Sequence, residues 1–309
     1  EQQIEGYLAH KWGGSANLPT THPYRYVAPV FDNAPQLTPG IGQYGYDQIT
    51  RTGLIGEWLF DDNDTASAIA DTSGMASPSN GAVVNGTFST DTPRGSGHSL
   101  NFFGSNGYAT ISTAGKETLF NGSDAMTIAL WSKRMPAADW GALISKYGES
   151  SAGWQLRKDN TGKLVFQTFG LSSGYNPAIP TAENNMTTVQ WRHITVVHGH
   201  GGNKLRIYLD GNLVDEKVRS GTITASNGYD LVLGAKDNDS TAGTFSINAQ
   251  SNAHLDDVRI YNRALGEHEI ASMIITSNRI PAFVATPFSY SIPSTRGPTS
   301  WSVAGDNLS

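Results

Sequence analysis

Between Leu54 and Tyr261 the sequence is built from short apolar segments, each only long enough for one β-strand. About a dozen of these, among them LIGEWLF, MTIALWS, WRHITVVH and HLDDVRIYN, are separated by clusters of Gly, Asn, Asp and Ser, which favour turns. KLRIYLDGNLVDE is the clearest hairpin, because apolar and polar residues alternate up to an Asp-Gly pair. So many short strands bury their apolar faces by packing two sheets together. The sequence therefore predicts an all-β fold, a two-sheet antiparallel β-sandwich with short peripheral helices.

The composition excludes several classes of function. A formal net charge of -6 argues against partners such as nucleic acid or an anionic membrane surface. No apolar run reaches the roughly 18 residues that membrane insertion requires. The chain contains no Cys, which excludes disulfides and thiolate chemistry. Charged residues make up only 16% of the chain and Gly is abundant, as expected of an all-β protein with many turns.

Changes in composition and in the spacing of apolar residues divide the chain into three regions. Residues 1–52 begin with EQQIEGYLAHKWGG, whose apolar residues recur at helical spacing, and continue as an extended linker rich in Pro, Gly and Tyr. Residues 53–276 hold the strands and end with ALGEHEIASMII, which is expected to form a helix with Ile270, Met273 and Ile274 on one side. Residues 277–309 change again, into a linker followed by strand-like pieces rich in Pro, Ser and Thr.

Residues 53–276 resemble the laminin-G-like domains of the concanavalin A superfamily, of the kind found in large bacterial surface and secreted proteins. The resemblance is carried by GLIGEWLFDD, SLNFFGSNGYATI, MTIALWSK, WRHITVVHGHGGNKLRIYLDGNLV and HLDDVRIYNRALGEHEI, in the family's order. It implies a jelly-roll, concanavalin A-like sandwich, and an extracellular location, either secreted or at the cell surface. One departure is Phe103, which stands before Gly104 where the family usually has Asp.

The two ends of the chain resemble parts of further domains. Residues 1–23 resemble the tail of a preceding laminin-G-like repeat, and ALGEHEIASMII echoes it within this chain. TPFSYSIPSTRGPTSWSVAGDNLS resembles the first strands of an immunoglobulin-like repeat. We therefore expect a slice of a longer multi-domain protein, with neighbouring domains of the same long chain as partners. The alternative is a mature protein with an N-terminal helix and an unusual C-terminal tail.

The sequence does not indicate a catalytic role. Retaining glycosidases, which the superfamily includes, need two carboxyl groups about 5–5.5 Å apart, and residues i and i+2 of one strand share a face and can supply them. No Glu-x-Asp-x-Glu run is present, and Asp256 and Asp257 are expected to point to opposite faces of their strand. His198 and His200, with His193 upstream, have the residue type for a transition metal. The alternative is that they flank a Gly-rich turn.

Calcium is the stronger metal candidate. It takes six to eight oxygen ligands from carboxylates, carbonyls and water, and the loop after GEWLF is rich in Asp. The resemblance implies a structural calcium ion between such a loop and the terminal strand, which points to Asp71 and Asp256, with Asp61 as a weaker third ligand. The alternative is that these side chains form Asx-turns and solvated loops.

Exposed aromatic rings near polar loop residues suggest sugar binding. A sugar presents apolar C–H faces and many hydroxyls, so its sites combine an aromatic ring with amide, carboxylate or guanidinium groups. The candidate ligand-binding residues lie near turn signals or at strand starts: Trp140, Tyr147, Tyr175, Trp154 and Arg157. For Trp154 the sequence favours a place in the core over a place in the site. Trp58, Trp131 and Trp191 are expected at inward positions of strands, in the core.

These features together favour a non-catalytic carbohydrate-binding or adhesion module whose partner is a polysaccharide or other glycan. The rival hypothesis is a structural spacer or assembly module of an extracellular fibre or stalk, with termini that pair with neighbouring domains. It rests on residues 283–303, which alternate well enough to form a strand with unpaired edges.

Overall fold

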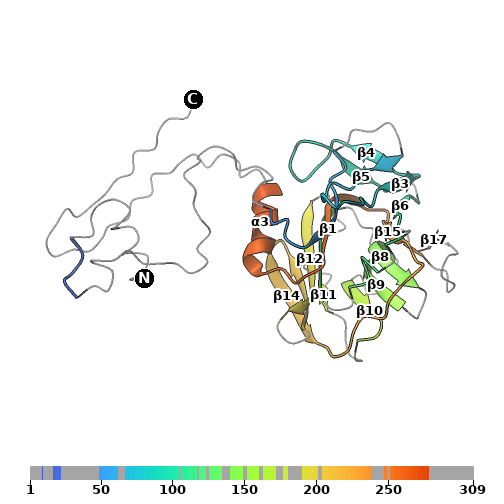
Figure 1. Ribbon diagram of the computed structural model, residues 1–309. Helices are drawn as coiled ribbons and strands as arrows, with labels where there is room; N and C mark the ends of the chain where they lie inside the picture. Colours follow the sequence, from blue (N-terminus) through green and yellow to red (C-terminus); the bar gives the residue numbers. More distant parts are fainter. Residues whose placement is uncertain are drawn as a thin grey trace. The chain divides into compact units, whose positions relative to one another are not determined.

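The structure is a computed structural model of the chain (Figure 1). It describes residues 9, 17–21, 49–61, 67–104, 106–113, 115–116, 118–122, 125–133, 140–148, 152–159, 163–171, 177–179, 190–200, 204–237, 247–248 and 251–277. The sandwich belongs to one compact unit, Tyr44–Arg279. The helix and linker predicted for residues 1–52 and the segment predicted for 277–309 lie almost wholly outside the described residues.

Two antiparallel sheets form the described fold, as predicted. The first sheet has the order β14-β13-β12-β7-β18-β5-β4, and β1 pairs with β18. Its strands are β1 (Leu54–Trp58), β4 (Thr87–Ser89), β5 (Ser99–Asn101), β7 (Met126–Lys133), β12 (Arg192–His200), β13 (Lys204–Leu209), β14 (Asn212–Val218) and β18 (His254–Tyr261).

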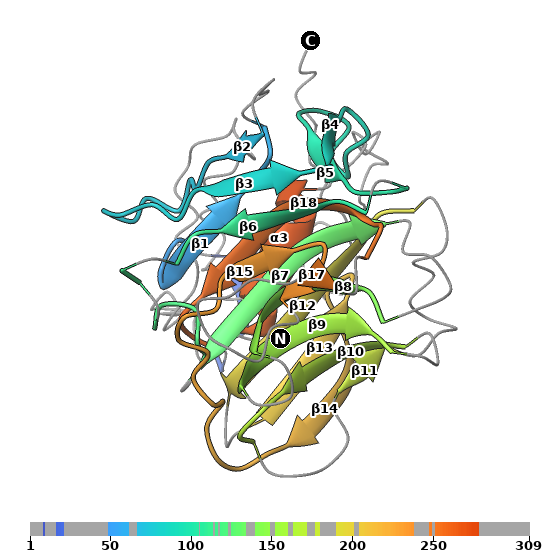
Figure 2. The same ribbon diagram turned by 90° about the vertical axis from the view of Figure 1, so that its right-hand side faces the viewer.

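The second sheet has the order β11-β10-β9-β8-β15-β6-β3-β2. Its strands are β2 (Ala68–Ile69), β3 (Gly81–Val84), β6 (Tyr108–Ile111), β8 (Ala142–Gly148), β9 (Ala152–Lys158), β10 (Leu164–Thr168), β11 (Ala178–Ile179) and β15 (Leu231–Leu233). A separate pair, β16 (Lys236–Asp237) and β17 (Ile247–Asn248), follows β15. Figure 2 shows the second sheet in front of the strands of the first.

Strand alternation explains how the core forms. On β7, Ile128 and Leu130 join the main apolar cluster, and on the second sheet Leu156 and Phe166 meet them. The Asp-Gly pair of the predicted hairpin connects β13 to β14, and both of its residues have positive φ, 48° at Asp210 and 81° at Gly211. Positive φ at both central residues is what a two-residue type I′ turn requires.

One helix, α3 (Glu267–Ser277), covers part of the outer face of the first sheet (Figure 1). Its Ile270 and Met273 are fully buried, as predicted, in a second apolar cluster with Ala129 of β7, Val197 of β12 and Tyr261 of β18. Glu267 and Glu269 lie in the first turn, where a negative charge favours the positive end of the helix dipole. No helix among these described residues is long and apolar enough to cross a lipid bilayer.

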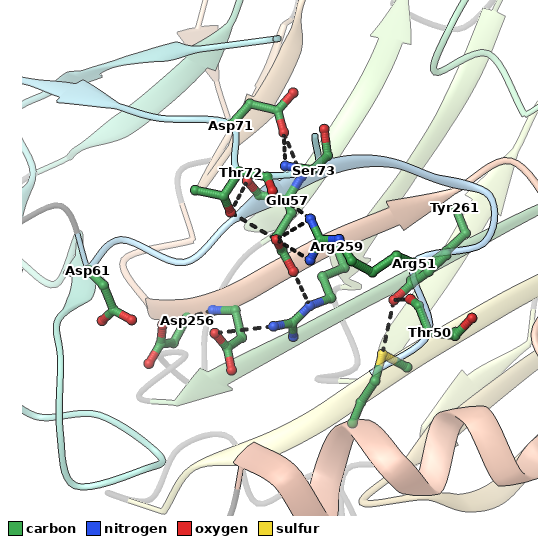
Figure 3. A network of polar contacts seen from close by, with 12 residues as sticks. Thr50, Arg51, Glu57, Asp61, Asp71, Thr72, Ser73, Asp256, Arg259 and Tyr261 are labelled. Atoms are coloured by element: carbon green, nitrogen blue, oxygen red, sulfur yellow. Dashed lines mark hydrogen bonds and ion pairs between the residues drawn. The ribbon is translucent and has the colours of Figure 1, made fainter. Parts of the chain in front are cut away.

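A buried ion pair joins the first strand of the sandwich to the last. Glu57 of β1 lies directly opposite Arg259 of β18, and Arg259 Nε donates to Glu57 Oε1 at 2.9 Å. The second carboxylate oxygen, Oε2, accepts from Thr72 Oγ1 at 2.9 Å and from Arg51 at 3.3 Å (Figure 3). Arg259 is fully buried and Glu57 nearly so. The pair therefore fixes β1 on the sheet through a charge that solvent does not screen.

We predict that Glu57→Gln lowers the free energy of unfolding by about 3 kcal/mol, because it leaves the buried Arg259 charge without its closest counter-ion. Guanidinium denaturation measures the change. Glu216→Gln on β14 is the matched control, since Glu216 also pairs with an arginine, Arg206, but at the surface. Equal stability of Glu57→Gln and wild type would contradict the structural role of the pair.

Candidate functional site

Two of the predicted sugar-binding residues, Trp140 and Arg157, meet at the surface. Trp140 precedes β8 and is 46% exposed. The guanidinium carbon of Arg157, on β9, lies 4.4 Å from the centre of the Trp140 ring, within the range of a cation–π contact. Arg157 Nε also donates to Gln167 Oε1 of β10 at 2.7 Å, and this hydrogen bond fixes the orientation of the Arg157 guanidinium group.

Two glutamines extend this polar surface across the outer face of the second sheet. Gln155 and Gln167 lie directly opposite each other on β9 and β10, and Gln155 Nε2 donates to Gln167 Oε1 at 3.1 Å. Gln155 is 2% exposed, and its Oε1 has no hydrogen-bond partner. Arg157 follows Gln155 by two residues and shares its face. We call these four residues, Trp140, Gln155, Arg157 and Gln167, the Trp140 surface.

The other predicted rings do not join the Trp140 surface. Tyr147 is only 4% exposed because Phe169 packs at 5.4 Å between ring centres and the Lys236 ammonium lies 5.2 Å from its ring centre. Trp154 is fully buried in the core, where its Nε1 donates to the Phe120 carbonyl at 2.8 Å. The prediction of ligand binding at the surface is wrong for Tyr147, and Trp154 occupies the core position that the sequence favoured for it. Tyr175 lies outside the described residues.

The outer face of the first sheet carries a second cluster, which the sequence prediction missed. Trp131 and Trp191 were predicted to point inward, but both share the parity of residues that face outward, such as Ala129 on β7 and Val197 on β12. Trp191 is half-buried and its Nε1 donates to Asp91 Oδ1 at 3.1 Å. Trp131 is buried, yet outside the main core. The sequence contained a signal for this. In MTIALW the apolar Ile128 and Leu130 mark the inward-facing positions of β7, and Trp131 falls on the alternate, outward-facing set.

Helix α3 packs against one half of this outer face. Its apolar cluster takes the half near Ala129, Val197 and Tyr261. Two to four residues further along the same strands the face becomes polar, and it carries Trp131 and Lys133 of β7, His193 of β12, and His254, Asp256 and Arg259 of β18. We call these six residues the polar half of the first sheet. All are buried.

A bulge in β18 turns two neighbouring carboxylates toward one arginine. The pairing of β18 with β7 shifts between Asp256 and Arg259, and Asp257 has a positive φ of 48°. Arg94 Nη2 therefore lies 3.0 Å from Asp257 Oδ1 and 3.9 Å from Asp256 Oδ1, and it also contacts Asp61 Oδ2 at 3.2 Å. The expectation that Asp256 and Asp257 point to opposite faces is wrong, because it assumed an unbroken strand.

Burial sets the charge of two groups in the polar half. Burial, and next the neighbouring charge of Asp257, raise the pKa of Asp256 to about 9, so this carboxyl group is neutral at pH 7. Burial, and next the charge of Arg259, lower the pKa of His193 to about 3, so the imidazole is neutral as well. The Nδ1 atom of His193 lies 3.3 Å from Thr195 Oγ1.

The three predicted calcium ligands do not fit a calcium ion. Asp71 uses both oxygens on backbone donors, because Oδ1 accepts from the N–H groups of Glu57 and Ser73 and Oδ2 from that of Ser79, at 2.8 to 3.1 Å (Figure 3). Asp61 and Asp256 both face the Arg94 guanidinium instead. Over the described positions no group of three or more His, Asp or Glu is placed to hold a metal ion. This includes His193 and His198, whose partner His200 has no described side chain.

We predict that the melting temperature of the protein is nearly the same in calcium as in a chelator, because the carboxylates already face the positive charge of Arg94. Differential scanning fluorimetry in excess calcium and in excess chelator measures this. A large stabilisation by calcium, of the size that mass action gives for a tightly bound ion, would show that calcium binds and that the geometry of these side chains changes around it.

The change in stability above neutral pH tests whether Asp256 is protonated in the folded protein. The folded chain holds a proton on Asp256 up to about pH 9, whereas the unfolded chain releases it near the ordinary value of 3.8. The free energy of unfolding therefore falls as pH rises between these values, by at most about 1.4 kcal/mol per pH unit. His193 has the opposite sign but acts only below 6.5. We predict that the free energy of unfolding, measured by urea denaturation, falls less between pH 7 and 9 for Asp256→Asn than for wild type. Equal slopes for the two proteins would refute a buried neutral acid at this position.

Comparison with known proteins agrees with this architecture. Several solved structures of low sequence identity share the fold. The botulinum neurotoxin DC binding domain in complex with rat synaptotagmin II has a TM-score of 0.52 at 16% identity, and the match covers 74% of this chain and 52% of that one. The same domain in complex with SialylT gives 0.51 at 16%, with 74% and 52% covered. Trypanosoma rangeli sialidase in complex with sialic acid gives 0.51 at 16%, with 74% and 33% covered.

The match thus spans about half of the toxin binding domains and a third of the sialidase. Curated protein sequences gave no significant match. The family model for the concanavalin A-like lectin/glucanases superfamily, Laminin_G_3, matches residues 103–271, which is more than half of the chain. With two antiparallel sheets in the order described, this chain belongs to the laminin-G-like group of the concanavalin A-like lectin/glucanase superfamily.

Proposed function

We propose that this chain is a non-catalytic carbohydrate-binding module of a secreted or cell-surface protein. The observation that carries the proposal is the Trp140 surface, where an exposed ring lies beside a guanidinium group and two amides that are oriented by one another. Solved structures that share the fold include a sialidase in complex with sialic acid. That support is by analogy of fold alone.

The chemistry of the Trp140 surface suits a sugar. An indole ring accepts the apolar C–H face of a pyranose by stacking, and Trp140 has nearly half of its surface exposed for this. Arg157 is an adjacent donor for ring and hydroxyl oxygens, and the buried Gln155 supports it from below through Gln167. Because Gln167 already holds the Arg157 side chain, few rotamers are lost when a ligand binds.

The same surface argues against catalysis. Glycoside hydrolysis needs a pair of carboxyl groups, and the Trp140 surface is made of indole, amide and guanidinium groups without one. The carboxylates on the outside of the first sheet are engaged by arginines, since Glu57 pairs with Arg259 and Asp257 with Arg94. We infer that this chain holds a glycan rather than cleaves it.

A structural or assembly role is the second candidate, and one observation favours it. β14 ends the first sheet, and its Leu213 and Val218 are 46% and 72% exposed. An edge strand with exposed apolar residues tends to pair with another chain. Light scattering after size-exclusion chromatography distinguishes the two: self-association that Val218→Lys abolishes would favour assembly, and a monomer would favour the glycan-binding function.

We predict that Trp140→Ala weakens polysaccharide binding at least about tenfold, because it removes the stacking ring and the contact that orients Arg157. Affinity electrophoresis through gels containing plant, animal and marine polysaccharides measures the retardation. Phe103→Ala is the matched control, since Phe103 is also an exposed ring, 50% exposed, but lies in the turn between β5 and β6.

Three results would decide the proposal. Retardation of wild type and Phe103→Ala but not of Trp140→Ala would support the Trp140 surface as the site. Equal retardation of all three proteins would place the glycan elsewhere. A wild-type protein that no polysaccharide retards would overturn carbohydrate binding at this surface.

A further inference from the structure

The loop between β4 and β5, residues 90–98, lies against the outer face of the first sheet, and we call it the strap. Its two ends stand side by side, because Ser89 and Ser99 are directly opposite each other on the paired strands. Within the loop the Thr92 hydroxyl donates to the carbonyl of Ser96 at 3.0 Å. The strap is therefore a compact loop of the Ω type, whose ends meet and which bonds to itself.

Two charged side chains tie the strap to the rest of the sandwich. The Asp91 carboxylate binds the Lys133 ammonium of β7. The Arg94 guanidinium lies 3.0 Å from the carboxylate of Asp257 on β18 and 3.2 Å from that of Asp61. Both anchors therefore hold the strap at the polar half of the first sheet, away from the apolar half against which α3 packs.

The strap has no apolar anchor. Within the described part of the chain, none of its side chains belongs to either apolar cluster of the sandwich, whereas Leu100 just beyond it belongs to the main cluster and Phe88 just before it packs against that cluster. Only Thr92 and Arg94 of the strap are buried, and its tip, residues 95–97, is exposed. A segment that buries little apolar area and is held by polar contacts opens at a lower free energy than the whole fold.

Buried atoms next to the strap gain hydrogen bonds when it opens. Asp256 Oδ1 lies 3.9 Å from Arg94 Nη2, and Asp256 is fully buried. Its other oxygen, Oδ2, has no hydrogen-bond partner among the described residues, and neither does Nε1 of Trp131, directly opposite on β7. Leaving such atoms unmet costs free energy, and water bonds to them once the strap has moved away. Their hydration therefore offsets part of the cost of breaking the ion pairs.

Gly97 allows the strap to close on Asp61. The His98 N–H donates to Asp61 Oδ1 at 2.9 Å, and Gly97 has a φ of 79°. A Cβ at position 97 would lie 1.9 Å from Asp61 Oδ1, so a side chain there and the closed strap exclude each other unless Asp61 moves away. Gly95 has a similar φ of 69°, but a Cβ at position 95 meets no described atom within 4 Å outside its chain neighbours.

We propose that the strap opens as a unit while both sheets stay folded, and that its opening exposes the polar half of the first sheet around Asp256. In the closed state the charges of Asp91 and Arg94 hold the strap in place. In the open state these charges, and the carboxyl groups beneath Arg94, are hydrated instead. The inference makes no use of the Trp140 surface, so it does not depend on the proposed function.

Trypsin tests this directly, because the strap contains one site for it, the bond between Arg94 and Gly95. In the closed strap the Arg94 side chain is only 6% exposed. When a loop opens and closes faster than it is cut, the rate of cleavage follows the open population. Mass spectrometry would follow the new N-terminus at Gly95. Each rate would be divided by that of a free peptide of residues 88–101 with the same sequence, so that cleavage elsewhere in the chain does not count.

Wild type should be cut at this bond at least about tenfold faster than its globally unfolded fraction, known from urea denaturation, allows. Gly97→Ala should be cut at least about tenfold faster than Gly95→Ala, because only the first substitution displaces Asp61. The two variants should differ little in global stability. If Gly97→Ala fails to fold, Asp91→Asn, which removes the charge of the other anchor, takes its place with the same expectation.

Any one of three results would overturn the proposal. Cleavage of wild type no faster than global unfolding allows would mean that the strap opens only together with the sandwich. Equal rates for Gly97→Ala and Gly95→Ala would mean that the contact with Asp61 does not hold the strap closed. A loss of global stability in Gly97→Ala that accounts for its whole increase in cleavage would mean that strap and sandwich unfold as one unit.

Discussion

The ion pair between Glu57 and Arg259 is the contact on which the arrangement of the sandwich depends. Among the described strands β1 pairs with β18 alone, so the first and last strands of the fold hold each other in place. A buried pair of this kind is stabilising only when the remaining polar atoms of both groups are satisfied. Glu57 meets this condition through Thr72 and Arg51, whereas Arg259 does not, because its Nη atoms have no hydrogen-bond partner. The contact that closes the fold therefore also leaves donors on the outer face of the first sheet.

What covers the outer face of each sheet determines where a ligand can bind. On the first sheet α3 covers the apolar half around Ala129 and Tyr261. On the second sheet Phe169 and Lys236 cover Tyr147, and the polar residues around Arg157 remain beside the exposed Trp140. In both cases the groups named here cover apolar or aromatic side chains, as expected when burial of apolar area decides which segments pack. The polar half of the first sheet is buried as well, and Arg94 and Asp91 contact it.

The sequence was sufficient for the fold and only partly sufficient for the site. Alternation and turn residues predicted the sandwich, the hairpin at Asp210 and the helix α3, because these depend on local periods. The meeting of Trp140 with Arg157 could not be derived, since it depends on the pairing of β8 with β9. Trp131 and Trp191 were assigned to the core because they are large and apolar, although the parity of their strands places them outside. The bulge at Asp257 interrupts the alternation of β18, and the pattern of apolar and polar residues in the sequence does not reveal it.

Arg94 shows how one side chain changes the chemistry of a whole region. Three carboxyl groups, those of Asp61, Asp256 and Asp257, converge on its guanidinium. A guanidinium carries a single positive charge, which does not offset three ionised carboxylates. Burial, and next the charge of Asp257, raise the pKa of Asp256 to about 9, so Asp256 retains its proton at pH 7. A neutral acid is a hydrogen-bond donor as well as an acceptor. The Arg94 guanidinium and the protonated Asp256 together limit the unbalanced negative charge in this buried part of the first sheet.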